Sequence, residues 1–77
     1  MKKYKVEYLF FNGIPIREED LDTAYEIMVA RNEKDYIKAD FLRKKLEDFY
    51  YGVRCEKDKI ILHAPFCLSE VAITLIT

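Results

Sequence analysis

Two consecutive amphipathic helices are predicted by residues 18–51, EEDLDTAYEIMVARNEKDYIKADFLRKKLEDFYY. The acidic run at positions 18–20 favours a helix N-terminus, because negative charge there offsets the helix dipole. The first helix is expected over about residues 18–31. Its buried stripe would be Leu21, Ala24, Tyr25, Met28 and Val29.

The second helix is expected to begin after Asn32, a residue type that can break one helix and cap the next. It should run to about Tyr51 and end at Gly52, because glycine favours the backbone conformation of a helix end. Since the joint between them is short, the two helices should form an antiparallel hairpin. The buried stripe of the second helix would be Tyr36, Ala39, Leu42, Leu46, Phe49 and Tyr50.

A strand pattern precedes the helices. Aromatic and apolar residues occupy every second position from Tyr4 to Phe10, which is the period of a half-buried strand. The dipeptide Asn12-Gly13 then marks a turn. Pro15 cannot donate to a sheet, so the residues around it belong to an edge or a connection.

A β-hairpin and a final strand are predicted after the helices. Residues 53–55 and 59–63 would form the hairpin across Lys57-Asp58. The almost continuously apolar run 71–76 is typical of a central strand. The facing pairs of the hairpin would be Val53 with Leu62, Cys55 with Ile60, and the oppositely charged Glu56 with Lys59.

The predicted order is therefore β-α-α-β-β-β in a single domain, residues 1–77. This order implies a two-layer α+β fold, with a four-stranded antiparallel-rich sheet and the helical hairpin packed on one face. A chain of 77 residues has room for one core and little room for a deep substrate cleft.

Charge, hydropathy and cysteine content limit the classes of function. The chain has 13 basic and 14 acidic residues, so no overall field attracts nucleic acid or an anionic membrane. No apolar run approaches the roughly 20 residues of a membrane span, and no signal-peptide pattern follows the basic start. Two cysteines, Cys55 and Cys67, are too few for a disulfide-dependent miniprotein, which favours reduced thiols and a cytoplasmic location.

No catalytic, cofactor-binding or metal-binding residue is predicted. Two glycines cannot build a phosphate-binding loop, and the two cysteines with His63 are too few for a structural zinc site. The predicted hairpin places Cys55 and His63 on opposite faces of the sheet. Cys67 lies closer to His63 in the sequence, so a thiol-dependent enzyme or redox protein that uses Cys67 is a remote alternative.

The second helix carries an apolar pair on its outward side. Ile37 and Phe41 lie nearly opposite the buried stripe when residues are placed around a helix. Lysines at positions 34, 38, 44 and 45 surround the pair. An apolar pair within a polar rim has the composition of a small contact site. The alternative is that the helix is more deeply buried and that the pair belongs to the core.

The sheet face turned away from the helices is the second candidate surface. If the alternating residues of the first strand face the helices, Leu9 and Phe11 face away, and Ile61 and Ile76 join them. Contiguous large apolar side chains are unusual on the surface of a monomer. A second copy of the chain or a partner protein would cover this face, unless the loop 64–69 covers it.

These features favour a non-enzymatic protein-binding or regulatory domain, for example an inhibitor that docks on a larger protein, as small virus-encoded inhibitors do. Its partner would be another protein or a second copy, and neither a cofactor nor a membrane is expected. The alternative is a small RNA-binding accessory domain, because a four-stranded sheet can stack unpaired bases on outward aromatic side chains. Phe11 is the one clearly outward aromatic residue of the predicted sheet, so protein binding is the preferred interpretation.

Overall fold

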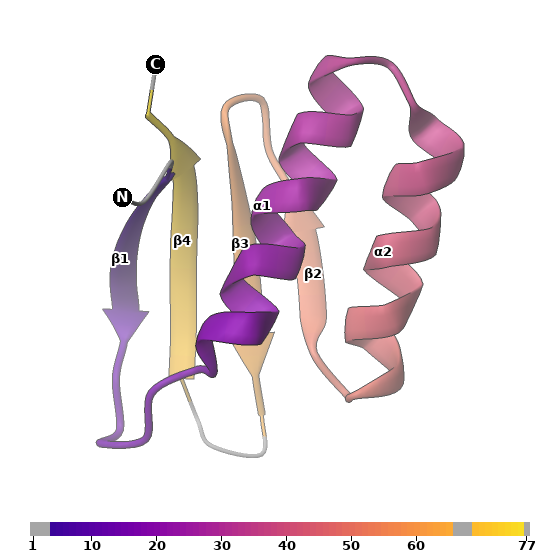
Figure 1. The fold of residues 1–77 in the computed structure, drawn as a ribbon. Helices are drawn as coiled ribbons and strands as arrows, with labels where there is room; N and C mark the ends of the chain where they lie inside the picture. The colour runs from indigo at the N-terminus through magenta and orange to yellow at the C-terminus, as the bar shows by residue number, and fades with distance from the viewer. Residues whose placement is uncertain (1–3, 66–68, 77) are drawn as a thin grey trace.

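The computed structural model has the predicted element order, with two helices packed on one face of a four-stranded sheet (Figure 1). It describes residues 4–65 and 69–76. The two-layer α+β class is confirmed. The elements are β1 (Tyr4–Phe10), α1 (Glu18–Asn32), α2 (Tyr36–Asp48), β2 (Gly52–Cys55), β3 (Lys59–Ala64) and β4 (Ser69–Leu75).

The sheet is antiparallel throughout, with the strand order β1-β4-β3-β2. The apolar C-terminal run therefore forms a central strand, as predicted. The register of the β2–β3 hairpin is also confirmed, with Val53 opposite Leu62 and Cys55 opposite Ile60. At the turn, the Glu56 N–H donates to the Lys59 carbonyl at 2.8 Å, and the predicted charge pair is present, with the side-chain nitrogen of Lys59 3.8 Å from the carboxylate of Glu56.

The core lies between the sheet and the helices. α1 packs over β3 and β4 and also against α2, whereas α2 packs over β2. Because β3 and β4 are central, their helix-facing side chains are almost completely enclosed. These are Ile60, Leu62, Ala64, Ser69, Val71 and Ile73. Neither helix, within the described residues, is long and apolar enough to cross a membrane.

The buried faces of the helices differ from the predicted stripes. In α1, Ile27 and Ala30 are buried and were not predicted, because this helix contacts the sheet on one side and α2 on the other. In α2, only the central part of the predicted stripe is buried, namely Ala39, Leu42 and Leu46. The remaining predicted positions, Tyr36, Phe49 and Tyr50, are exposed, because they lie at or beyond the ends of the helix.

The first helix has nearly the predicted bounds, whereas the predicted bounds of the second helix are wrong at both ends. Asn32 is the last residue of α1, and the cap of α2 is Asp35, whose carboxylate accepts a hydrogen bond from the Lys38 N–H. Two residues after the end of each helix the backbone is left-handed, at Lys34 with φ 61° and at Tyr50 with φ 67°. At the end of α2, Tyr50 takes the place in which glycine was expected, and Gly52 is instead the first residue of β2.

Candidate binding surfaces

The outward face of α2 carries the most exposed apolar pair of the described chain. Ile37 is 87% exposed and Phe41 is 66% exposed. They lie one helical turn apart, on the side opposite Leu42 and Leu46, which pack into the core. The prediction that this pair faces outward is confirmed, and the alternative that it belongs to the core is wrong.

The rim of this apolar pair is basic. Lys38 and Lys45 lie on one flank of the pair along the helix, Lys44 lies on the other, and Lys34 precedes the start of α2. None of these four lysines forms an ion pair with any other residue in the part of the chain that the structure describes. The carboxylates on this side are fewer, Asp40 and Asp48. The surface can therefore offer apolar contact together with several uncompensated positive charges.

The outer face of the sheet does not form the predicted apolar patch. Ile61 faces outward, because it pairs with Arg54 on one side and Ala72 on the other, yet it is only 5% exposed. A residue in the middle of a central strand is surrounded by neighbouring strands, so its flanking side chains cover it. Ile76 is exposed, but it follows the last residue of β4, at the end of the sheet opposite Leu9.

A register shift in β1 also changes the predicted orientation of its last residues. Tyr8 pairs with Val71, but Phe10 pairs with Glu70, so one extra residue, Leu9, is inserted between them. Phe10 therefore faces away from the helices, whereas the ring of Phe11 contacts Tyr8 at 5.0 Å between centroids. The predicted placement of Phe11 on the outer face is wrong, although both Leu9 and Phe11 are exposed.

Ion pairs engage Arg54, Lys59 and His63 on the outer sheet face, whereas Lys5 on this face has no ion pair among the described residues. Glu56 lies 3.3 Å from Arg54 and 3.8 Å from Lys59, measured between side-chain oxygen and nitrogen. His63 lies 3.3 Å from the carboxylate of Glu70. Glu56 would compete with phosphate for Arg54 and Lys59, which reduces the positive potential that this face could offer to nucleic acid.

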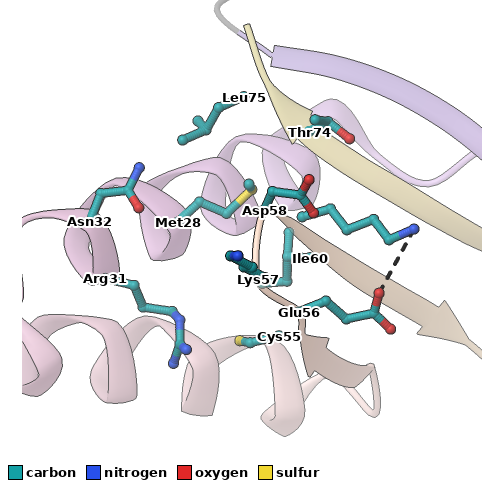
Figure 2. Close-up of a pocket in the computed structure, with 11 residues that line it drawn as sticks. Met28, Arg31, Asn32, Cys55, Glu56, Lys57, Asp58, Ile60, Thr74 and Leu75 are labelled. Atoms are coloured by element: carbon teal, nitrogen blue, oxygen red, sulfur yellow. Dashed lines mark ion pairs between the residues drawn. The ribbon is translucent and has the colours of Figure 1, made fainter. Parts of the chain in front are cut away.

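A pocket of about 330 Å³ lies between the end of α1 and the β2–β3 hairpin (Figure 2). Met28, Ile60 and Leu75 give it an apolar lining, and the half-buried thiol of Cys55 belongs to its wall. Cys55 faces the helices and His63 faces away from them, so the prediction that they lie on opposite faces is confirmed. The predictions for Cys67 cannot be compared with the structure, because this residue lies outside the described residues. Within residues 4–65 and 69–76, no group of His, Cys, Asp or Glu side chains could hold a metal ion.

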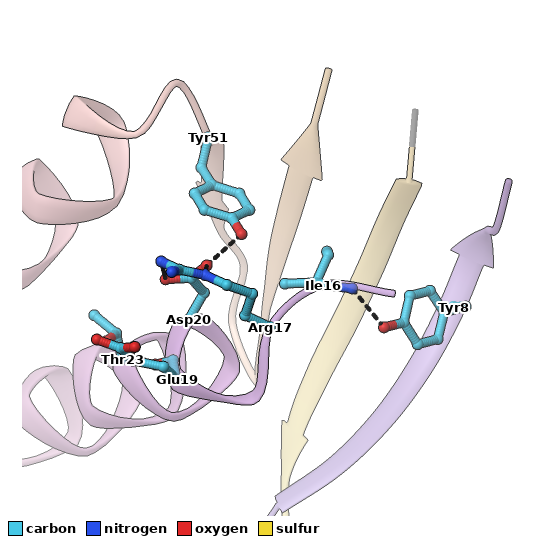
Figure 3. Close-up of polar contacts among 7 residues, drawn as sticks. All are labelled: Tyr8, Ile16, Arg17, Glu19, Asp20, Thr23 and Tyr51. Carbon is cyan, nitrogen blue, oxygen red and sulfur yellow. Dashed lines mark hydrogen bonds and ion pairs between the residues drawn. The ribbon is translucent and has the colours of Figure 1, made fainter. Parts of the chain in front are cut away.

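A buried carboxylate fixes the start of α1 (Figure 3). Asp20 is only 4% exposed and accepts hydrogen bonds from the Tyr51 hydroxyl and from the guanidinium of Arg17, whose Nε lies at 3.1 Å. The hydrogen bond from Arg17 to Asp20, together with the negative charge of this carboxylate, raises the pKa of Arg17 above its usual value. The guanidinium lies over the ring of Phe49, 5.6 Å from its centroid. Asp20 thus connects the start of α1 with Tyr51, in the segment that follows α2.

This network borders a shallow groove of about 480 Å³. The groove is lined by exposed side chains of the two connecting segments, Ile14, Pro15, Phe49 and Tyr50. Sequence reasoning assigned the acidic run of α1 only to the helix dipole and missed this arrangement. The spacing of Arg17 and Asp20, three residues apart, was the available signal, whereas the contribution of Tyr51 depends on the tertiary fold.

Comparisons with protein-family models, with curated proteins and with solved structures give no match for this chain. The surfaces of the chain itself are therefore the basis for a functional proposal.

Proposed function

We propose that this chain is a non-enzymatic protein-binding domain that regulates a larger protein by docking on it through the outward face of α2. The observation that carries the proposal is the exposure of Ile37 and Phe41, one helical turn apart, on a helix whose opposite side is buried in the core. An isolated exposed apolar residue has no special meaning, but an adjacent pair on a rigid helix forms one contact surface.

The chemistry of the rim indicates the kind of partner. Four lysines around the pair, at positions 34, 38, 44 and 45, would complement an acidic segment. An amphipathic helix whose apolar side chains are flanked by Asp and Glu would satisfy both features, since helices commonly dock through residues spaced three and four apart. Inhibition or another form of regulation would follow if that segment is needed for the partner's own activity.

A cytoplasmic location is part of the proposal. Cys55 is a free thiol on a half-buried position, which suits a reducing compartment. RNA binding has less support, because Arg54, Lys59 and His63 on the outer sheet face lie beside carboxylates, and because Phe10 is the outward aromatic side chain among the described residues of this face. It is therefore an outcome that the experiment must distinguish.

The test is quantitative affinity capture from a lysate of the source cells, using the wild type and Phe41→Glu as baits. The substitution should leave folding intact, because position 41 is exposed, and it should abolish capture by placing a negative charge against an acidic partner. Phe10→Glu is the matched control, since Phe10 is 57% exposed on the opposite face of the molecule. Capture should survive in this control and after nuclease treatment.

The opposite results would reject the proposal. If Phe41→Glu captures the same proteins as the wild type, the outward face of α2 is not the docking surface. If the captured material disappears with nuclease, the chain binds nucleic acid instead. Lys38→Glu provides an independent arm, because a loss of capture there would show that the lysine rim takes part.

A further inference from the structure

β1 is an edge strand with one side of its backbone open. It pairs with β4 only, and within the described residues no other strand lies against its second edge (Figure 1). α1 packs mainly over β3 and β4, and α2 over β2; α1 reaches β1 through side chains on the helix-facing side, where Asp22 and Tyr25 contact Tyr4. The other edge strand, β2, has four residues and lies under α2. An uncovered edge is a template for pairing with another chain.

The charged side chains of β1, Lys5 and Glu7, form no ion pairs within the described fold. Lys5 and Glu7 both point away from the helices and are exposed. Their cross-strand neighbours on β4 are Thr74 and Ala72, neither of which is charged. No ion pair of Lys5 or Glu7 occurs among residues 4–65 and 69–76. The one side from which an opposite charge could approach along the sheet is the open edge.

The sequence of the strand is complementary to itself. When β1 is paired antiparallel with a second β1 about a two-fold axis at Val6, Lys5 lies opposite Glu7 of the second copy, and Glu7 lies opposite Lys5 of the second copy. On the helix-facing side, Val6 meets Val6 of the second copy, and Tyr8 meets Tyr4 of the second copy. The half-buried state of Val6 and Tyr8 leaves apolar surface for these contacts.

Neighbouring registers are disfavoured by charge. An axis at Lys5 would set two lysines opposite each other, and an axis at Glu7 would set two glutamates opposite each other. The extra residue at Leu9 ends the regular part of the strand, so pairing cannot slide further in that direction. Of these three registers, the one centred on Val6 alone brings opposite charges together without placing like charges opposite each other, so the edge specifies both its partner and its alignment.

We infer that this chain forms a homodimer by pairing β1 with β1 of a second copy, in the register centred on Val6. Each copy contributes its four strands to one continuous antiparallel sheet. The two-fold axis is perpendicular to the sheet, so both helix layers lie on the same side. The outward faces of the two α2 helices are then at opposite ends of the dimer, where each copy can still engage a partner.

Charge reversal with rescue tests the inference. Sedimentation equilibrium over a range of concentrations should show a reversible dimer for the wild type. Lys5→Glu and Glu7→Lys should each raise the dimer dissociation constant by about tenfold or more, because each substitution creates two like-charged pairs across the axis. An equimolar mixture of the two variants should associate again, since glutamates at 5 and 7 of one copy face lysines at 7 and 5 of the other.

Controls separate this interface from other causes. Glu26→Lys changes the net charge equally at an exposed position of α1 and should leave the dimer unchanged. Thermal melts should show that all variants are folded, since positions 5 and 7 are exposed. The inference is overturned by a wild type that stays monomeric at millimolar concentration. It is equally overturned by single variants that dimerise as the wild type does, or by a mixture that fails to associate.

Discussion

Tyr50 is a position at which glycine should make the domain more stable. It follows the end of α2 with φ 67°, a left-handed conformation that is unfavourable for a residue with a side chain. The conformation is imposed by the helix end, where the Tyr50 N–H donates to the Glu47 carbonyl at 2.9 Å and the Tyr51 N–H to the Leu46 carbonyl at 3.2 Å. These bonds form the left-handed helix end that usually contains glycine.

The size of the effect follows from two opposing terms. Relief of the left-handed conformation should stabilise the fold by about 1–2 kcal/mol. The greater freedom of glycine in the unfolded chain should offset about 0.5–1 kcal/mol of this gain. Because the Tyr50 side chain is 80% exposed, its removal costs little buried area. A net gain near 1 kcal/mol should raise the melting temperature of Tyr50→Gly by about 4–8 °C.

Thermal unfolding followed by circular dichroism measures this shift. Lys34→Gly should act in the same direction, because Lys34 ends α1 with φ 61°. Glu33→Gly is the matched control, since Glu33 is exposed at the preceding position with φ −86° and should gain nothing from glycine. A melting temperature of Tyr50→Gly at or below that of the wild type would show that the left-handed end of α2 is not strained.

Three further predictions concern the core, alkaline pH and the thiol. Leu46→Ala should destabilise the fold by about 2–5 kcal/mol in urea titration, because truncating this fully buried side chain leaves a cavity in the core. Burial, followed by the hydrogen bond to Asp22, raises the pKa of the Tyr4 hydroxyl well above its usual value. Stability should therefore be intact below about pH 10 and fall as pH rises above it, when the unfolded chain ionises first, and Tyr4→Phe should reduce this fall. Cys55, a half-buried thiol, should react slowly with a chromogenic reagent in the native protein and rapidly after denaturation, without prior reduction.

Local chemistry was sufficient to predict most of the fold. The β2–β3 register follows from Val53 and Cys55 alternating with charged residues and from Glu56 facing Lys59, and the structure has this register. The outward position of Ile37 and Phe41 follows from helical periodicity, because α2 contacts the rest of the domain on one side only. Where an element is packed on two sides, as α1 is, periodicity underestimates what is buried.

The wrong predictions, of side-chain orientation in β1 and of the helix ends, have a common origin. In both places the backbone adopts a geometry that the residue types do not indicate. The register shift in β1 occurs at Leu9, where no glycine signals it. It turns Phe10 away from the helices and Phe11 toward Tyr8, which is the reverse of the prediction. The left-handed helix ends at Lys34 and Tyr50 also lack glycine, so the boundaries were misplaced. The complementarity of the β1 edge became visible only when the strand order showed which side of β1 is open.

The central claim, that the outward face of α2 contacts another protein, is tested most directly by site-specific photo-crosslinking in the source cells. A benzophenone amino acid placed at position 41 should give a covalent adduct with one protein, and the crosslinked peptide should be rich in Asp and Glu. The same probe at position 10, on the far side of the molecule, should not give this adduct. Identical adducts from both positions, an adduct to nucleic acid, or no adduct at position 41 would contradict the claim.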